Sequence, residues 1–207
     1  MPKTEQPLQA LSAFIPENTF EQVAAYIQKY KVHLTISRER ASILGDYRNA
    51  HNNRNHRISV NGNLNPYAFL ITLLHELAHL LTFDQYGHKV QSHGREWKKI
   101  FGDLLARFLG KNIFPPDVEK ELAASLVNPA ASSCAEDGLM RILRRYDKQK
   151  LNHLLIEDLQ TGQLFRLKDG RVFKKGEKLR KRYRCQEMAT GKYYLFSPVY
   201  EVEVINA

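Results

Sequence analysis

The chain has 207 residues, of which 43% are apolar or aromatic and 26% are charged, proportions typical of one large or two small globular domains. Its 31 Lys and Arg residues exceed its 22 Asp and Glu residues, so polyanions are the first class of partner to consider. Two cysteines, Cys134 and Cys185, are too few for a disulfide framework or a four-cysteine zinc site. The chain starts without the apolar segment of a secretory signal, and no uninterrupted apolar run predicts a membrane span. We therefore expect a soluble, intracellular protein that is cytoplasmic or associated with DNA.

The positive charge is concentrated towards the C-terminus. Residues 1–130 carry 15 basic and 12 acidic side chains, whereas residues 131–207 carry 16 and 10. Small residues from Asn128 to Ser133 indicate a connector between the two parts. We predict a first domain over 1–130, a connector over 131–150 and a basic, β-rich module over 151–207.

The first part is predicted to be α+β. Apolar residues at helical spacing favour a helix over 19–30, and alternating residues favour strands over 32–37 and 56–60, with 41–47 as a partner between them. Such short neighbouring strands predict a small antiparallel sheet.

Two further helices follow in the first part. Asn65 and Pro66 are an N-cap residue and a first-turn proline, so they predict the start of a long helix that continues through Phe83. A second helix is expected over about 92–109, ended by Gly110.

From Leu151 onwards the sequence predicts short strands without helices. The turn-forming pairs Thr161-Gly162, Asp169-Gly170, Lys175-Gly176 and Thr190-Gly191 punctuate this part. This meander pattern favours an all-β module, folded as a small barrel or a curled sheet.

The long predicted helix contains His75, Glu76 and His79, which form a His-Glu-x-x-His motif. Four residues turn a helix by roughly 400° and advance it by about 6 Å, so both imidazoles leave the same face and can bind one cation. A zinc ion with one open position lowers the pKa of its water to about 7, and a neighbouring carboxylate can accept the proton. The motif therefore predicts two Zn²⁺ ligands, His75 and His79, and a general base, Glu76.

A catalytic zinc ion needs a third protein ligand. The extended motif with a glycine and a third histidine shortly after the second is absent, because Thr82 and Gln85 occupy those positions. His93 at the start of the next predicted helix is our preferred third ligand, with His88 and Glu96 as alternatives.

The motif from His75 to His79 is followed, after a gap of 13 residues, by the segment from His93 to Trp97. In this combination the chain resembles the SprT-like metalloprotease family. The resemblance covers roughly residues 15–127. It implies a small zincin-type catalytic domain made of a helix, a short sheet, the motif helix and a third-ligand helix. It also implies that His75, His79 and His93 bind zinc, that Glu76 is the general base, and that the substrates are proteins associated with DNA.

The C-terminal part departs from the pattern of that family. Many members carry a zinc ribbon with two cysteine pairs there, whereas the segment from Arg182 to Met188 resembles a zinc knuckle in which Met188 replaces the second cysteine. We therefore expect a degenerate ribbon or small barrel that is stabilised by packing instead of metal.

Basic residues in this module suggest contact with nucleic acid. Residues 171–184 contain eight Lys and Arg residues and one acid. Interleaved aromatic residues can stack on bases or pack inward. The residues that we expect to contact DNA are Lys174, Lys175, Lys178, Arg180, Lys181, Arg182 and Arg184.

These observations predict a zinc-dependent endopeptidase that acts on proteins bound or crosslinked to DNA. In this hypothesis a metal-activated water attacks the peptide bond and Glu76 accepts its proton. The alternative is a non-catalytic module that binds nucleic acid or a protein partner and carries a structural or vestigial zinc site. The oligomeric state has no signature in the sequence.

Overall fold

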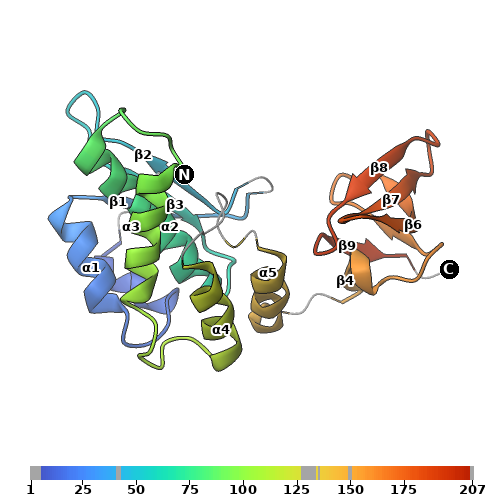
Figure 1. The fold of residues 1–207 in the computed structure, drawn as a ribbon, viewed down its shortest axis with the longest axis horizontal. Helices are drawn as coiled ribbons and strands as arrows, with labels where there is room; N and C mark the ends of the chain where they lie inside the picture. Colours follow the sequence, from blue (N-terminus) through green and yellow to red (C-terminus); the bar gives the residue numbers. More distant parts are fainter. Residues whose placement is uncertain (1–5, 41–42, 127–133, 135, 149–150, 206–207) are drawn as a thin grey trace. The chain divides into compact units, whose positions relative to one another are not determined.

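The computed structural model describes residues 6–40, 43–126, 134, 136–148 and 151–205 (Figure 1). The chain forms two compact units, residues 1–147 and 148–207, and each has its own hydrophobic core. The predicted connector residues 128–133 lie outside the described residues.

The sheet of the first unit is mixed and not antiparallel as predicted. It consists of β1 (His33–Ser37), β3 (Arg57–Asn61) and β2 (Gly45–Arg48), in that order. β2 pairs antiparallel with β3, and β1 pairs parallel with β3 on its other side. The antiparallel expectation fails because β3 inserts between its two predecessors and pairs with β1, which is far from it in sequence.

The first unit has one central helix, α2 (Pro66–Tyr86). Its other helical elements are η1 (Leu8–Ala13), α1 (Phe20–Lys29), α3 (Arg95–Ala106), α4 (Pro116–Ser125), α5 (Asp137–Leu143) and the short turn η2 (Arg144–Tyr146). Figure 1 shows α2 in the middle of the unit, where it contacts β2, β3 and α3. The Asn65 side chain accepts a hydrogen bond from the Ala68 N–H at 2.9 Å, which confirms the predicted cap.

The central helix α2 has the length and mean hydropathy of a membrane span. However, 72% of that apolar window is buried inside the protein. Leu70, Leu73, Leu74 and Leu77 are fully enclosed by neighbouring elements. We therefore describe α2 as the core helix of a globular unit.

Part of the predicted connector belongs to the first unit. Leu139 and Leu143 of α5 are buried in the core of this unit. The Asn65 amide also donates to the Leu143 carbonyl at 3.0 Å and to the Asp147 carboxylate at 2.7 Å. Residues 131–150 therefore include a helix that packs on the first unit, and the boundary between the units falls at Asp147 and Lys148.

The second unit is an antiparallel sheet, as the sequence predicts. The strand order is β4-β9-β5-β6-β7-β8, and the only helical element among the described residues of this unit is the short turn η3 (Ile156–Asp158). Phe165, Phe173 and Phe196 pack together in its core with Cys185. The strands are β4 (His153–Leu155), β5 (Leu164–Arg166), β6 (Val172–Leu179), β7 (Arg182–Glu187), β8 (Tyr193–Phe196) and β9 (Glu201–Val204).

Candidate functional site

The central helix α2 presents His75 and His79 on one face, one turn apart. Their Nε2 atoms are 3.2 Å apart, and their ring centroids are 5.0 Å apart. Two nitrogen ligands of one tetrahedral zinc ion, each about 2.0–2.1 Å from the metal, are separated by a similar distance, about 3.3 Å. The helical spacing therefore places both imidazoles within reach of a single ion.

His93 approaches this pair from the loop before α3. One ligand atom from each of His75, His79 and His93 lies within 4.8 Å of the others, so this group can hold a metal ion. Among the described residues, the other candidates His88 and Glu96 are not part of such a group. His88 is exposed and packs edge-on against Phe83.

The three imidazoles are held in the neutral form that binds metals. Burial, followed by the charges of His79 and His93, lowers the pKa of His75 to about 3. Burial and the charge of His93 lower the pKa of His79 to about 4, and the pKa of His93 is lowered by burial and then by Lys98. The buried Nε2 of His93 has no hydrogen-bond partner among the described residues. An unpaired lone pair at this position suits a metal ligand.

Trp97 on α3 forms a common wall behind the three histidines. Its ring centroid lies 4.6 Å from that of His75, 5.2 Å from that of His79 and 4.7 Å from that of His93. The indole is fully buried. Because it contacts every imidazole, it restricts the orientation of all three rings. Trp97 ends the motif that begins at His93, and the sequence alone predicts no role for it.

The carboxyl group of Glu76 is buried between α2 and β2. Burial and, to a lesser extent, the charge of Asp46 raise its pKa to about 8, and the charge of Arg40 opposes the shift. Gly45 of β2 lies directly against it, since a Cβ at this position would stand 2.6 Å from Glu76 Oε1. A glycine within a strand often marks such a close approach, so Gly45 is the signal in the sequence that indicates this contact.

Arg40 anchors the chain before β2 to the sheet. Its guanidinium donates to Asn61 Oδ1 at 2.8 Å and to Ser59 Oγ at 2.9 Å. The buried Asn61 amide donates in turn to the Ile43 carbonyl at 2.9 Å. These bonds fix the start of β2, and they therefore fix the distance between Gly45 and the Glu76 carboxyl group.

Tyr47 of β2 lies over the second histidine of the motif. Its ring is nearly parallel to that of His79, with the centroids 6.3 Å apart. Its hydroxyl is 2.9 Å from His56 Nδ1, which also accepts the Ala50 N–H. The hydroxyl is therefore the donor to Nδ1. Tyr86 is exposed at the end of α2.

Most of the basic residues predicted to contact DNA are exposed, but Lys175 is not. Lys175 is only 5% exposed, and its ammonium donates to the carbonyls of Glu157 and Leu159. As a contact to nucleic acid it was predicted wrongly, because strand alternation turns it away from its neighbour Lys174. The exposed residues are Lys174, Lys178, Arg180, Lys181, Arg182 and Arg184.

The outer face of β6, β7 and β8 combines basic and apolar side chains. Arg184 lies opposite Leu195 in the strand register, and its guanidinium stands 4.9 Å from the Tyr193 ring centroid. Tyr193 is 60% exposed and Leu195 is 53% exposed. In contrast, Phe173 and Phe196 point into the core. Tyr193 is therefore more exposed than Tyr194 and Tyr200, the other exposed aromatic residues of this unit.

Comparison with known proteins supports the resemblance found in the sequence. No curated protein and no solved structure matches the chain. The model of the SprT-like family matches residues 9–113. This range contains α1, the mixed sheet, α2 and α3, and thus all three histidines and Glu76. The chain belongs to the SprT-like family.

Proposed function

We propose that the protein is a zinc-dependent endopeptidase that cleaves proteins bound or crosslinked to DNA. The observation that carries this proposal is the convergence of His75, His79 and His93, with Glu76 on the same helix as two of them. Membership of the SprT-like family supports a metallopeptidase function.

The donor set fits the zinc ion that the family implies. Three neutral imidazoles are common ligands of catalytic zinc, and the unpaired, buried His93 Nε2 is accounted for if it binds the ion. With an open coordination position, such an ion polarises a carbonyl and lowers the pKa of water to about 7. His75, His79 and His93 would hold it.

The carboxyl group of Glu76 is suited to move a proton. A general base works best when its pKa is near the operating pH, and burial brings the pKa of Glu76 into that range. The carboxylate accepts a proton from the attacking water and passes it to the leaving amine. Gly45, in the strand whose start the Arg40–Asn61 bond fixes, packs directly against this carboxyl group and covers one side of it.

The second unit supplies the proposed affinity for DNA. Six of the predicted basic residues are exposed, and Arg184 and Tyr193 lie together on the same face. Lysine and arginine bind phosphates without sequence preference, and an exposed tyrosine can stack on an unpaired base. This combination favours single-stranded DNA as the ligand that concentrates the enzyme near its substrates.

Cleavage of a DNA-binding protein, measured with and without single-stranded DNA, tests the proposal. The enzyme has its zinc content determined and is compared with the Glu76→Gln variant, which we expect to retain zinc but not to cleave. Cleavage that requires both Glu76 and DNA would support the whole proposal. Cleavage by Glu76→Gln at the wild-type rate would exclude the mechanism.

The same experiment separates the remaining alternatives. Cleavage that is independent of DNA would support the peptidase activity but contradict the proposed role of the basic face in recruiting the enzyme to DNA. If zinc-loaded protein cleaves no substrate under either condition, a non-catalytic module with a structural zinc site becomes the better description. A structural site is closed by a fourth protein ligand, so it lacks an exchangeable water.

A further inference from the structure

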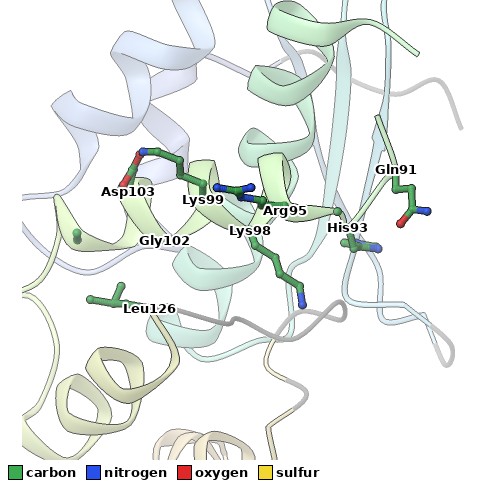
Figure 2. A pocket seen from close by; sticks show the side chains of 10 residues that line it. Gln91, His93, Arg95, Lys98, Lys99, Gly102, Asp103 and Leu126 are labelled. Carbon is green, nitrogen blue, oxygen red and sulfur yellow. The ribbon is translucent and has the colours of Figure 1, made fainter. Parts of the chain in front are cut away.

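A groove runs along the outer side of α3 and begins at the candidate metal centre. It has a volume of about 690 Å³. Figure 2 shows Gln91 and His93 at one end and Gly102, Asp103 and Leu126 at the other. His93 belongs both to the metal-binding group and to the wall of the groove. A chain that lies across the metal centre can therefore continue into this groove.

The groove wall has a positive charge in its middle part. Arg95, Lys98 and Lys99 lie between the two ends in Figure 2. Lys99 donates to the Asp103 carboxylate at 2.7 Å, so these two charges offset one another. Arg95 and Lys98 carry the other two positive charges of the lining. Lys98 lines the same groove as His93, which belongs to the metal-binding group, so its charge lies near the metal centre.

The chemistry of the groove favours a peptide over a nucleic acid. A polyanionic backbone would carry phosphates along the whole groove, where it would meet the Asp103 carboxylate and the apolar Leu126 side chain. A peptide can present one acidic side chain to Arg95 and Lys98 and an apolar side chain to Leu126. The lining therefore offers positive charge to one acidic side chain and an apolar surface to another side chain of the same segment.

We propose that this groove is a substrate subsite that selects an acidic side chain, Asp or Glu, close to the cleaved bond. The inference rests on the proposed peptidase function and names a feature of its substrates. Arg95 and Lys98 attract the carboxylate, and the groove beyond them receives the next residues of the substrate. The basic second unit and the acid-selective subsite then recognise different ligands.

Binding to the full-length Glu76→Gln protein loaded with zinc tests the subsite without requiring turnover. The probes are short, unstructured, fluorescently labelled peptides that are identical except for one position, which carries Glu, Gln or Lys. The position is moved along the peptide in successive sets, and binding is followed by anisotropy. At one position we expect Glu to bind about fivefold more tightly than Gln, a difference that shrinks as salt is added.

Charge reversal at Lys98 provides the decisive comparison. In the Glu76→Gln background, Lys98→Glu should invert the order, so that the Lys peptide binds better than the Glu peptide. Lys111→Glu makes the same charge change at an exposed position outside the residues that line the groove, and it should leave the order unchanged. A variant that merely unfolds would weaken all three peptides equally, and circular dichroism would detect it.

Three results would overturn the subsite. The first is equal binding of the Glu, Gln and Lys peptides at every position. The second is an unchanged order in Lys98→Glu. The third is loss of single-stranded DNA binding in Lys98→Glu without any change in peptide preference, which would assign the groove to nucleic acid. Failure of the peptidase proposal is separate, because it would appear as absence of Glu76-dependent cleavage while the binding order persists.

Discussion

Gly45 of β2 lies directly against the carboxyl group of Glu76. A methyl group at position 45 would stand 2.6 Å from Glu76 Oε1 and 2.7 Å from Thr72 Cγ2. The glycine is therefore required by space and not by an unusual backbone conformation. The edge strand β2 acts as a wall that holds the proposed general base against α2.

Gly45→Ala should damage activity more than it damages the fold. The added methyl group forces Glu76 and Thr72 to shift, and overpacking of this kind costs about 1–3 kcal/mol of stability. A displacement of the base by about 1 Å can lower the rate by about 100-fold. We expect a folded, zinc-binding variant with strongly reduced peptide cleavage. Thermal unfolding and zinc content are the controls, and activity close to wild type would show that the base tolerates the displacement.

Trp97 should determine the zinc affinity although it is not a ligand. Its indole contacts all three histidine rings, whereas Phe101 contacts only His75 among them, with the centroids 5.3 Å apart. Groups that orient ligands typically change metal affinity by about 10- to 100-fold. We expect Trp97→Leu to weaken zinc by about tenfold or more, and Phe101→Leu to have a smaller effect. Competition with a chromophoric chelator measures both, and equal losses would contradict the orienting role of Trp97.

The third ligand can be identified by a matched pair of histidine variants. His93 belongs to the metal-binding group, and the exposed His88 packs on Phe83 outside it. His93→Ala should lose zinc at chelator concentrations at which His88→Ala remains fully loaded. Metal analysis after dialysis against the chelator is the measurement. Full zinc retention in His93→Ala would move the third ligand elsewhere.

The candidate site could be predicted largely because its ligands follow local rules. Helical spacing alone brings His75 and His79 to one face, and α2 has the predicted cap at Asn65. His93 could be predicted as the third ligand because it begins the short segment from His93 to Trp97 at the start of the next helix. These predictions depend on residues that are close in sequence, and the structure brings their side chains together.

The parts that escaped prediction depend on pairing between distant segments. The parallel pairing of β1 with β3 requires a crossover that strand alternation does not encode. The contact between Gly45 and Glu76 also exists only after β2 packs on α2. In the second unit, successive side chains of β6 point to opposite faces of the sheet, so Lys174 and Lys175 cannot both lie on the exposed face.

Lys174 and Lys175 should therefore respond differently to substitution. Lys174 is exposed on β6, whereas the buried Lys175 ammonium donates to the carbonyl of Glu157 in η3 and to that of Leu159, which follows η3. Lys175→Met leaves these carbonyls without their donor and should destabilise the second unit by about 1–3 kcal/mol. Lys174→Met should leave stability nearly unchanged and weaken binding to single-stranded DNA, with a smaller salt dependence.

Urea unfolding and a fluorescent oligonucleotide titration separate these two effects. If Lys175→Met is as stable as wild type and also loses DNA affinity, the lysine must reach the surface. If Lys174→Met changes neither property, the outer face of β6 does not contact DNA.

The histidine cluster should make the metal-free protein sensitive to acid. Burial lowers the pKa of His75 to about 3 and that of His79 to about 4, below the usual value of 6.5 for histidine. At pH values below 6.5 and above about 4, these two histidines are protonated in the unfolded chain but not in the folded one. Stability is therefore fully present above about pH 6.5 and is lost as the pH falls towards 4. Thermal unfolding of chelator-treated protein at a series of pH values measures the loss.

Removal of the two imidazoles identifies the source of this acid sensitivity. A variant with His75→Gln and His79→Gln lacks both groups, so its melting temperature should fall less between pH 6.5 and 4 than that of the metal-free wild type. Zinc-loaded wild type should melt higher than the metal-free form at neutral pH and converge with it in acid, because the ion binds only unprotonated imidazoles. Equal pH dependence in the metal-free wild type and the double variant would show that other groups cause the acid transition.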